Sequence, residues 1–97
     1  MRIVWQDHAK IELRDAVQYY RANAGDHVAH DFRNEVQHTA RQLLEHPEIG
    51  VRLHQKLRRY ALHGYPFNLV YRLTPETIII VALAHQSRRP GYWADRR

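Results

Sequence analysis

Cysteine is absent from the 97-residue sequence, methionine occurs once, and glycine and proline occur four times each. The absence of cysteine excludes a disulfide framework, a thiolate zinc site and a cysteine nucleophile. Long apolar runs are also absent. The longest, residues 78–84, is far shorter than the roughly 20 residues that cross a bilayer, and the N-terminus does not resemble a signal peptide. We therefore expect a cytoplasmic protein.

Acidic side chains are scarce in the second half of the chain. Residues 1–48 carry 6 basic and 8 acidic side chains, a net charge of −2, whereas residues 49–97 carry 9 basic and 2 acidic ones, a net charge of +7. Together they give the +5 of the whole chain. This excess of positive charge predicts an anionic partner, which could be nucleic acid, an acidic protein segment or a membrane surface. Composition alone leaves these three open.

The length and composition predict one globular domain that spans residues 1–97. With 44% hydrophobic and 26% charged residues the chain is close to globular averages. A chain of this size buries about two-thirds of the surface that its unfolded form exposes, which suffices for one modest core. From about residue 86 the sequence becomes a basic tail interleaved with aromatic residues.

Two amphipathic helices are predicted in the first half. Apolar residues recur at steps of three and four through residues 9–20 and again through residues 29–44, as on one face of an α-helix. Gly25 separates the two patterns, because glycine readily adopts the left-handed conformation that ends helices, and Pro47 ends the second pattern. The short turn between them predicts an antiparallel helix hairpin.

The residues before these helices complete the N-terminal prediction. Residues 3–5, Ile-Val-Trp, form a short apolar run that favours a strand. Asp7 and Asp26 each precede an amphipathic pattern, and an aspartate carboxylate can accept hydrogen bonds from unpaired helical N–H groups. We therefore expect Asp7 and Asp26 to be the N-caps of the two helices.

Three strands are predicted in the second half. The period changes from helical to alternating, and turn-forming residues separate three segments, 57–62, 67–73 and 77–85. Residues 78–84 are apolar at every position, as in a central strand covered on both faces. The prediction is therefore an α+β fold of order βααβββ, with an antiparallel sheet packed against the helix hairpin.

No constellation for a metal or a covalent intermediate is apparent. The chain has no glycine-rich phosphate loop, no His-Glu-x-x-His and no serine-centred nucleophile elbow. The histidines are scattered without a carboxylate cluster at ligand spacing: His8, His27, His30, His38, His46, His54, His63 and His85. We expect no metal site and no cofactor.

The basic residues of the strands are more informative. Residues 49–75 contain no acidic side chain, and their basic side chains are Arg52, Lys56, Arg58, Arg59 and Arg72. These form either a solvated strand face, with ion pairs to helix carboxylates such as Glu12, Asp15 or Glu35, or an anion-binding surface. Unpaired like charges repel one another unless a partner compensates them, which favours anion binding for the set as a whole.

The tail holds the remaining candidates. His85 ends the last predicted strand beside Arg88, Arg89 and Tyr92, and a histidine among guanidinium groups suits general acid–base chemistry on a phosphodiester. The alternative is a strand-end histidine that is hydrogen-bonded to backbone. Tyr92 and Trp93 could stack on nucleic-acid bases, but we expect Trp93 to fold back onto the core.

The order, spacing and length of these segments resemble a known family. The helix hairpin is followed by Pro-Phe-Asn-Leu-Val-Tyr-Arg at 66–72, Ile-Ile-Ile-Val-Ala-Leu-Ala-His at 78–85 and Arg-Arg-Pro-Gly-Tyr-Trp at 88–93. Over nearly the whole chain this arrangement resembles the ParE/RelE superfamily of small bacterial toxins. The resemblance implies the toxin of a type II toxin–antitoxin, or plasmid stabilisation, system. Its partner would be a small antitoxin whose disordered C-terminal segment wraps the toxin and folds upon it.

The residue at position 68 bears on the activity that the resemblance implies. RelE-like members cut messenger RNA in the ribosomal A site and resemble one another in an arginine just before the Leu-Val-Tyr of the third strand. Here that residue is Asn68, which removes a group that would stabilise charge on the scissile phosphate. Lys56 still matches a basic residue of the family's second strand. A ribonuclease acting on the ribosome and mRNA would use Arg58, Arg72, His85 and Tyr92.

The ending of the chain resembles the other branch of the superfamily. ParE-like members bind DNA gyrase and trap its cleaved-DNA state, so they are not enzymes and need no catalytic constellation. The segment from His85 to Trp93 resembles this branch, and together with Asn68 it favours a gyrase inhibitor. The residues expected to bind the target or the antitoxin are Lys56, Arg58, Arg59, Arg88, Arg89 and Trp93.

The partner surfaces follow from the same resemblance. We expect an amphipathic antitoxin segment in a groove on the helix hairpin, with an added strand or carboxylates near the basic sheet edge. No membrane partner is implied. A third hypothesis, from a different class, is a nontoxic nucleic-acid-binding module, which predicts steeply salt-dependent binding to free DNA or RNA.

Overall fold

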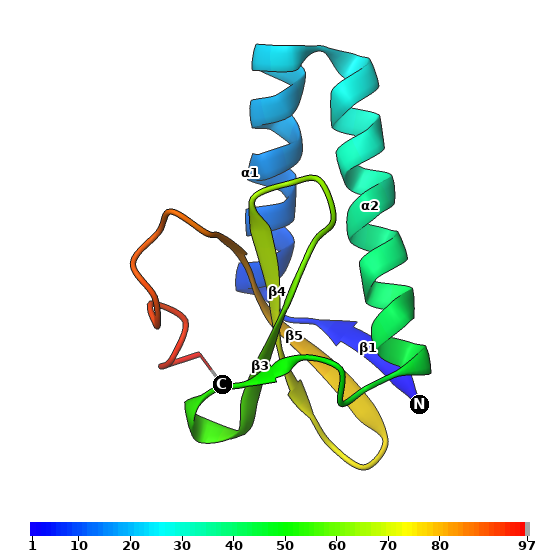
Figure 1. The fold of residues 1–97 in the computed structure, drawn as a ribbon. Coiled ribbons are helices and arrows are strands. Elements are labelled where there is room, and N and C mark those ends of the chain that lie inside the picture. Colours follow the sequence, from blue (N-terminus) through cyan, green and yellow to red (C-terminus); the bar gives the residue numbers. More distant parts are fainter. Residues whose placement is uncertain (97) are drawn as a thin grey trace.

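The computed structural model describes residues 1–96 as a helix hairpin on one face of a five-stranded sheet (Figure 1). The elements are, in order, β1 (Arg2–Trp5), α1 (Asp7–Ala24), α2 (Asp26–Glu45), β2 (Val51–Arg52), β3 (Leu57–Ala61), β4 (Phe67–Leu73) and β5 (Thr77–His85). A tight turn, His54–Lys56, joins β2 to β3. The predicted α+β fold is confirmed. The sequence does not predict β2, since two exposed residues carry no periodicity.

Both helices begin one residue earlier than the capping prediction requires, and that prediction is wrong. Asp7 and Asp26 are the first residues of α1 and α2, and the N-cap positions are occupied by Gln6 and Gly25, which make no side-chain capping bond. Gly25, at φ 93°, both ends α1 and precedes α2, so Asp26 already lies in the first turn. There its negative charge interacts favourably with the N-terminal end of the helix dipole, and its carboxylate pairs with Arg21 at 3.1 Å.

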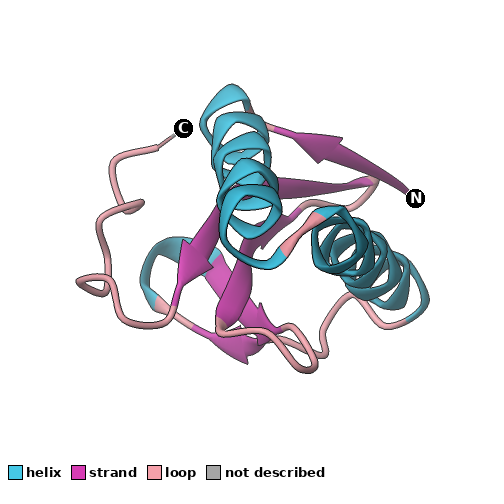
Figure 2. Cartoon of the chain, turned by 90° about the horizontal axis from the view of Figure 1, so that it is seen from above, coloured by secondary structure: helices cyan, strands magenta, loops and turns pink. Residues whose placement is uncertain are grey.

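The strand order is β1-β5-β4-β3-β2. β1 runs parallel to β5, whereas every other neighbouring pair is antiparallel. β5 is therefore flanked by strands on both sides, and its nearly continuous burial confirms the prediction of a central strand covered on both faces. The two helices run antiparallel, as predicted, and cover one face of the sheet while leaving the other face without a helix (Figure 2).

Two apolar clusters, one on each face of the sheet, hold the layers together. The larger lies between the helices and the sheet and includes Phe32, Val36, Leu43, Leu69 and Ile80. The smaller, which we call the second core, lies on the helix-free face, where Val70, Val81 and Ala82 pack with Trp93 of the tail. Trp93 is only 9% exposed, which confirms that it folds back onto the body of the protein.

Candidate functional site

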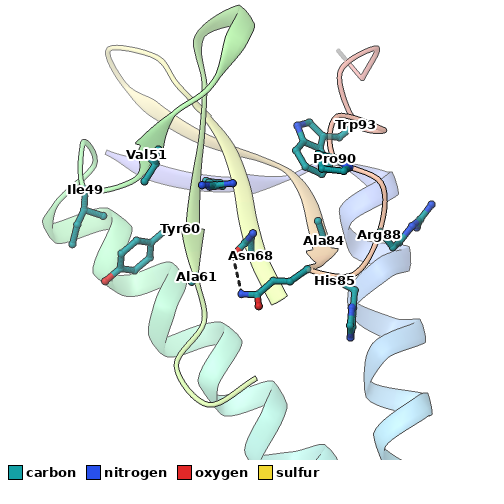
Figure 3. A pocket seen from close by; sticks show the side chains of 12 residues that line it. Ile49, Val51, Tyr60, Ala61, Asn68, Ala84, His85, Arg88, Pro90 and Trp93 are labelled. Carbon is teal, nitrogen blue, oxygen red and sulfur yellow. Dashed lines mark hydrogen bonds between the residues drawn. The ribbon is translucent and has the colours of Figure 1, made fainter. Parts of the chain in front are cut away.

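A groove crosses the helix-free face of the sheet between β3 and the C-terminal tail (Figure 3). Its larger part is a cavity of about 570 Å³, whose lining includes Ile49, Val51, Arg59, Asn68, His85 and Arg88. A second cavity of about 480 Å³ shares Arg59, Pro90 and Trp93 with the first. No acidic side chain lines either cavity. We call this continuous feature the sheet groove.

Adjacent arginines on β3 point to opposite faces of the sheet. Arg59 pairs in register with Val70 of the second core, so it faces the sheet groove, where it is exposed. None of the ion pairs among residues 1–96 includes Arg59. Arg58 instead donates from Nη1 to the carbonyl oxygens of Glu48, at 3.0 Å, and Gly50, at 3.1 Å. Of the two, Arg59 is therefore the one that offers its charge to a ligand.

The loop between α2 and β2 forms one wall of the sheet groove. Tyr71, which is fully buried, fixes this loop: its hydroxyl donates to the Pro47 carbonyl at 2.8 Å and accepts from the Gly50 N–H at 2.9 Å. A Cβ at Gly50 would lie 2.6 Å from the Tyr71 hydroxyl oxygen, so only glycine fits there. The loop thereby places Ile49, 42% exposed, and Val51, 57% exposed, along the groove.

His85 lies at the end of β5 and is among the residues that line the sheet groove, while its ring packs against Phe67 of the larger core, with 4.9 Å between the ring centroids. Its Nδ1 accepts the backbone N–H of Ser87 at 3.0 Å and lies 2.7 Å from the Ser87 hydroxyl. Because Nδ1 is an acceptor, the proton of the neutral ring is on Nε2. Beside it, Gln86 Nε2 donates to Asn68 Oδ1 at 3.3 Å, so an amide pair stands where the ribonuclease hypothesis needs a guanidinium (Figure 3). The structure therefore shows the strand-end histidine bonded to backbone.

Tyr92 contacts α1 and does not line the sheet groove. Its hydroxyl donates to Glu12 at 2.8 Å, and the Arg88 guanidinium carbon lies 3.9 Å from its ring centroid. Burial, followed by the hydrogen bond and the negative charge of Glu12, raises the Tyr92 pKa to about 12. The phenol is therefore protonated at neutral pH and acts as a hydrogen-bond donor.

The four residues of the ribonuclease hypothesis do not gather around one cavity. His85 lines the sheet groove, whereas Arg58 lines a separate cavity of about 400 Å³ with Arg52 and Lys56. Arg72 donates to the backbone carbonyl of Arg96 at 3.4 Å. Tyr92, the fourth, is held by α1 as described above. No shared position is therefore left at which a phosphodiester could meet all four.

The residues predicted to bind a partner are divided between two surfaces and the tail. Arg59, Arg88 and Trp93 line the sheet groove. Lys56 and Arg58 line the separate 400 Å³ cavity at the edge of the sheet. Arg89 is exposed in the tail. The sheet groove is thus the surface on which the largest share of the predicted binding residues meets.

The roles of Glu12 and Arg96 are not predicted from the sequence. Glu12 is expected there only as a partner of the strand arginines, whereas the structure pairs it with Arg96 of the tail at 2.8 Å. A signal was available, because Glu12 follows Ala9 by three residues and precedes Ala16 by four, which places it on the buried stripe of α1. A carboxylate on such a stripe needs a buried partner.

Neither a metal site nor a membrane span is seen in the described part of the chain. Within residues 1–96 no three histidine, aspartate or glutamate side chains gather as metal ligands. No helix in the same residues has the length and apolarity required to cross a bilayer.

The helix hairpin, the five-stranded sheet and the strand order define a ParE/RelE-like α+β fold. A solved structure of the chromosomal ParDE TA system from P. aeruginosa superposes with a TM-score of 0.78 at 18% identity, over 88% of this chain and 95% of that chain. The isolated E. coli RelE toxin gives a TM-score of 0.56 at 18% identity, over 93% and 88% of the two chains.

The sequence itself assigns the chain to a family. Residues 3–90 match the family of the ParE toxin of the type II toxin–antitoxin system parDE, and the chain belongs to this family. A comparison with curated proteins finds no match. The protein is therefore a type II toxin, a class whose partner is an antitoxin, and the predicted superfamily resemblance is confirmed.

Proposed function

We propose that this toxin inhibits DNA gyrase in the cytoplasm and is neutralised by its cognate antitoxin. The dispersal of Arg58, Arg72, His85 and Tyr92 over separate contacts is the observation that carries the proposal. A ribonuclease needs an acid, a base and a charge-stabilising group around one phosphate. A protein that traps a gyrase–DNA intermediate needs only a binding surface. The sheet groove, which has no acidic side chain in its lining and lies beside the basic tail, can serve as that surface.

A supercoiling assay tests this proposal. Purified toxin without antitoxin is added to gyrase and relaxed plasmid, and we expect loss of supercoiling with accumulation of cleaved DNA. Full supercoiling at saturating toxin would contradict it. Prior addition of the cognate antitoxin should restore supercoiling.

The antitoxin has two surfaces available on this chain. The sheet groove combines the exposed apolar side chains Ile49 and Val51 with the charge of Arg59, which suits an acidic segment that also carries apolar side chains. On the other side of the sheet, a cavity of about 450 Å³ lies between β1 and the helices, lined in part by Val4, Trp5 and Leu13. This cavity between β1 and the helices suits the apolar face of an amphipathic helix.

One observation supports a ribosome-dependent mRNA endoribonuclease as the second candidate. His85, Arg59 and Arg88 are all among the residues that line one groove, although the His85 ring packs against Phe67 and the Arg88 guanidinium lies over the Tyr92 ring. Toeprinting on translating ribosomes tests it, and the absence of A-site cleavage with intact toxin would remove it. The supercoiling and toeprinting assays together separate the two candidates.

A further inference from the structure

The edge of β5 is incomplete where β1 ends. β1 pairs with β5 only as far as Trp5 opposite Ile80, whereas β5 continues to His85. Just beyond this point the register between β4 and β5 shifts, and Val81 and Ala82, although adjacent, both belong to the second core. Such a bulge disturbs the ladder, and buried backbone groups beside it need other partners.

An ion pair supplies these partners. Arg96 Nη1 donates to the Val81 carbonyl at 3.1 Å, and the Leu83 N–H donates to Glu12 Oε1 at 3.1 Å. Arg96 and Glu12 are joined by two bonds, Nη1 to Oε1 at 2.8 Å and Nη2 to Oε2 at 3.1 Å. Their side chains are 15% and 14% exposed, so this charge-assisted fork is shielded from water. The pair takes the place of a neighbouring strand and ties α1, β5 and the tail together.

Glu12 also holds the aromatic part of the tail. Its Oε2 accepts from the Tyr92 hydroxyl at 2.8 Å, and the Tyr92 ring in turn carries the Arg88 guanidinium. The two carboxylate oxygens of Glu12 thus accept four hydrogen bonds, so this one side chain of α1 makes all of these contacts. The contacts run from Glu12 through Tyr92 to a cation beside the sheet groove.

The tail has little other structure to fix its position. Its described residues, 86–96, form turns and no helix or strand, and their backbone hydrogen bonds beyond residue 86 stay local, as in Ala94 to Gly91 and Arg96 to Trp93. At its start Gln86 bonds Pro66 and Asn68, and beyond that point the tail is connected to the rest of the protein by the packing of Trp93 in the second core and by the bonds of Arg96 and Tyr92. Glu12 is the helix residue that bonds both the Tyr92 hydroxyl and the Arg96 guanidinium.

We propose that Glu12 is a positioning residue for the C-terminal tail, which it holds so that Arg88 and Arg89 stand beside the sheet groove in the arrangement that the target recognises. The recognition part rests on the proposed function. Glu12 itself is covered and does not touch the target. Loss of the Glu12 side chain releases Tyr92 and Arg96 and so frees the tail. Arg88 and Arg89 then sample many positions, and binding of the target must order them again at an entropic cost.

Trp93 is a built-in reporter of the tail. In a Trp5→Phe background it is the one tryptophan of the chain, so acrylamide quenching of its fluorescence measures its exposure. We expect Glu12→Gln, which keeps an acceptor oxygen but loses the charge, to raise the quenching constant about twofold, and Glu12→Ala to raise it further. Asp15→Asn is the matched control, because this exposed carboxylate lies on the same helix and, among residues 1–96, pairs only with Arg14. It should leave quenching unchanged.

The supercoiling assay with the same variants tests the functional part. We expect Glu12→Gln to require about tenfold more toxin for half-inhibition, equivalent to about 1.4 kcal/mol of lost binding, while its far-UV circular dichroism stays that of the parent. Unchanged quenching in both Glu12 variants would overturn the proposal whatever gyrase does. Greater quenching with unchanged potency would overturn the positioning role. If the parent toxin fails to inhibit gyrase, the proposed function fails, and the quenching experiment still decides whether Glu12 holds the tail.

Discussion

At the scale of single residues, neighbouring side chains on one strand have different tasks. Arg58 is bonded to backbone carbonyls of the loop before β2, whereas Arg59 faces the sheet groove without a carboxylate partner among the described residues. A charge that is already bonded internally contributes to stability, and a charge that is exposed in a groove contributes to recognition. The predicted pair of binding arginines therefore separates into one structural and one recognition residue.

Charge reversal distinguishes the two arginines. We expect Arg59→Glu to slow antitoxin association about tenfold at low salt, because it replaces attraction by repulsion, with the free energy of unfolding unchanged within about 0.5 kcal/mol. Arg58→Glu should instead lower the free energy of unfolding by about 2 kcal/mol, since it removes two hydrogen bonds and places a carboxylate against carbonyl oxygens. Stopped-flow association and urea unfolding measure the two effects. Equal behaviour of the two variants would contradict the division.

Tyr92 gives a pH dependence whose sign can be worked out. Its pKa rises from the ordinary 10.0 to about 12 in the folded protein because of burial and the hydrogen bond to Glu12. A raised pKa means that folding favours the protonated phenol, so the stabilisation is fully present below pH 10 and is lost as the pH rises towards 12.

Alkaline unfolding measures this contribution. We expect Tyr92→Phe to flatten the decline of stability between about pH 10 and 12, measured by urea unfolding at each pH. Part of the decline in the free energy of unfolding should remain in this variant, because burial and Asp31 likewise raise the pKa of Tyr65 to about 12. Tyr19→Phe is the control, since that side chain is 63% exposed. A decline as steep in Tyr92→Phe as in the parent would show that Tyr92 does not contribute.

At the scale of elements, the turn between β2 and β3 carries unusual backbone geometry. Gln55 and Lys56 have φ values of 60° and 63°, and the Leu57 N–H closes the turn on the His54 carbonyl. Positive φ at both central positions is the geometry of a type I′ hairpin turn, in which Asn-Gly is preferred. Here the second position instead carries a basic side chain that lines the 400 Å³ cavity.

Relief of this turn should stabilise the protein. We expect Gln55→Asn combined with Lys56→Gly to raise the free energy of unfolding by about 1 kcal/mol, because both residues then tolerate positive φ. Lys56→Ala is the matched control, since it removes the same charge without relieving the backbone, and it should not be stabilising. Thermal unfolding compares the three proteins, and a double variant no more stable than Lys56→Ala would contradict the strain.

At the scale of the whole molecule, the protein is built on two cores with the sheet between them. The helix hairpin covers one face, and the second core on the other face is covered by the tail, whose described part forms turns without helix or strand. The sheet groove exists because this cover is partial: the tail occupies the β5 side of the face and leaves the β3 side open. Stability and partner binding therefore depend on the same segment.

Removal of the cover tests this arrangement. We expect Trp93→Ala to lower the free energy of unfolding by about 3 kcal/mol and to increase the binding of an apolar dye, because Val70, Val81 and Ala82 lose their covering side chain. Trp93→Phe, which keeps an aromatic ring, should cost less. Urea unfolding gives the comparison, and a loss below about 1 kcal/mol in Trp93→Ala would mean that the tail does not complete a core.

The sequence by itself determines the helices, the β3-β4-β5 meander and the α+β class, because these follow from periodicities of a few residues and from glycine and proline at their ends. It also predicts the buried Trp93 and the concentration of positive charge on the strands and tail. The bulge in β5 leaves no such signal, since residues 78–84 are apolar at every position and any register reads alike.

Only the tertiary structure decides the parallel pairing of β1 with β5, the separate directions of Arg58 and Arg59, and the pairing of Glu12 with Arg96. Each depends on contacts between residues far apart in the chain, where the local pattern carries no information about the partner. The positive charge of the second half was readable from composition. Tertiary packing decides which of the basic side chains are bonded within the fold and which remain exposed for a partner.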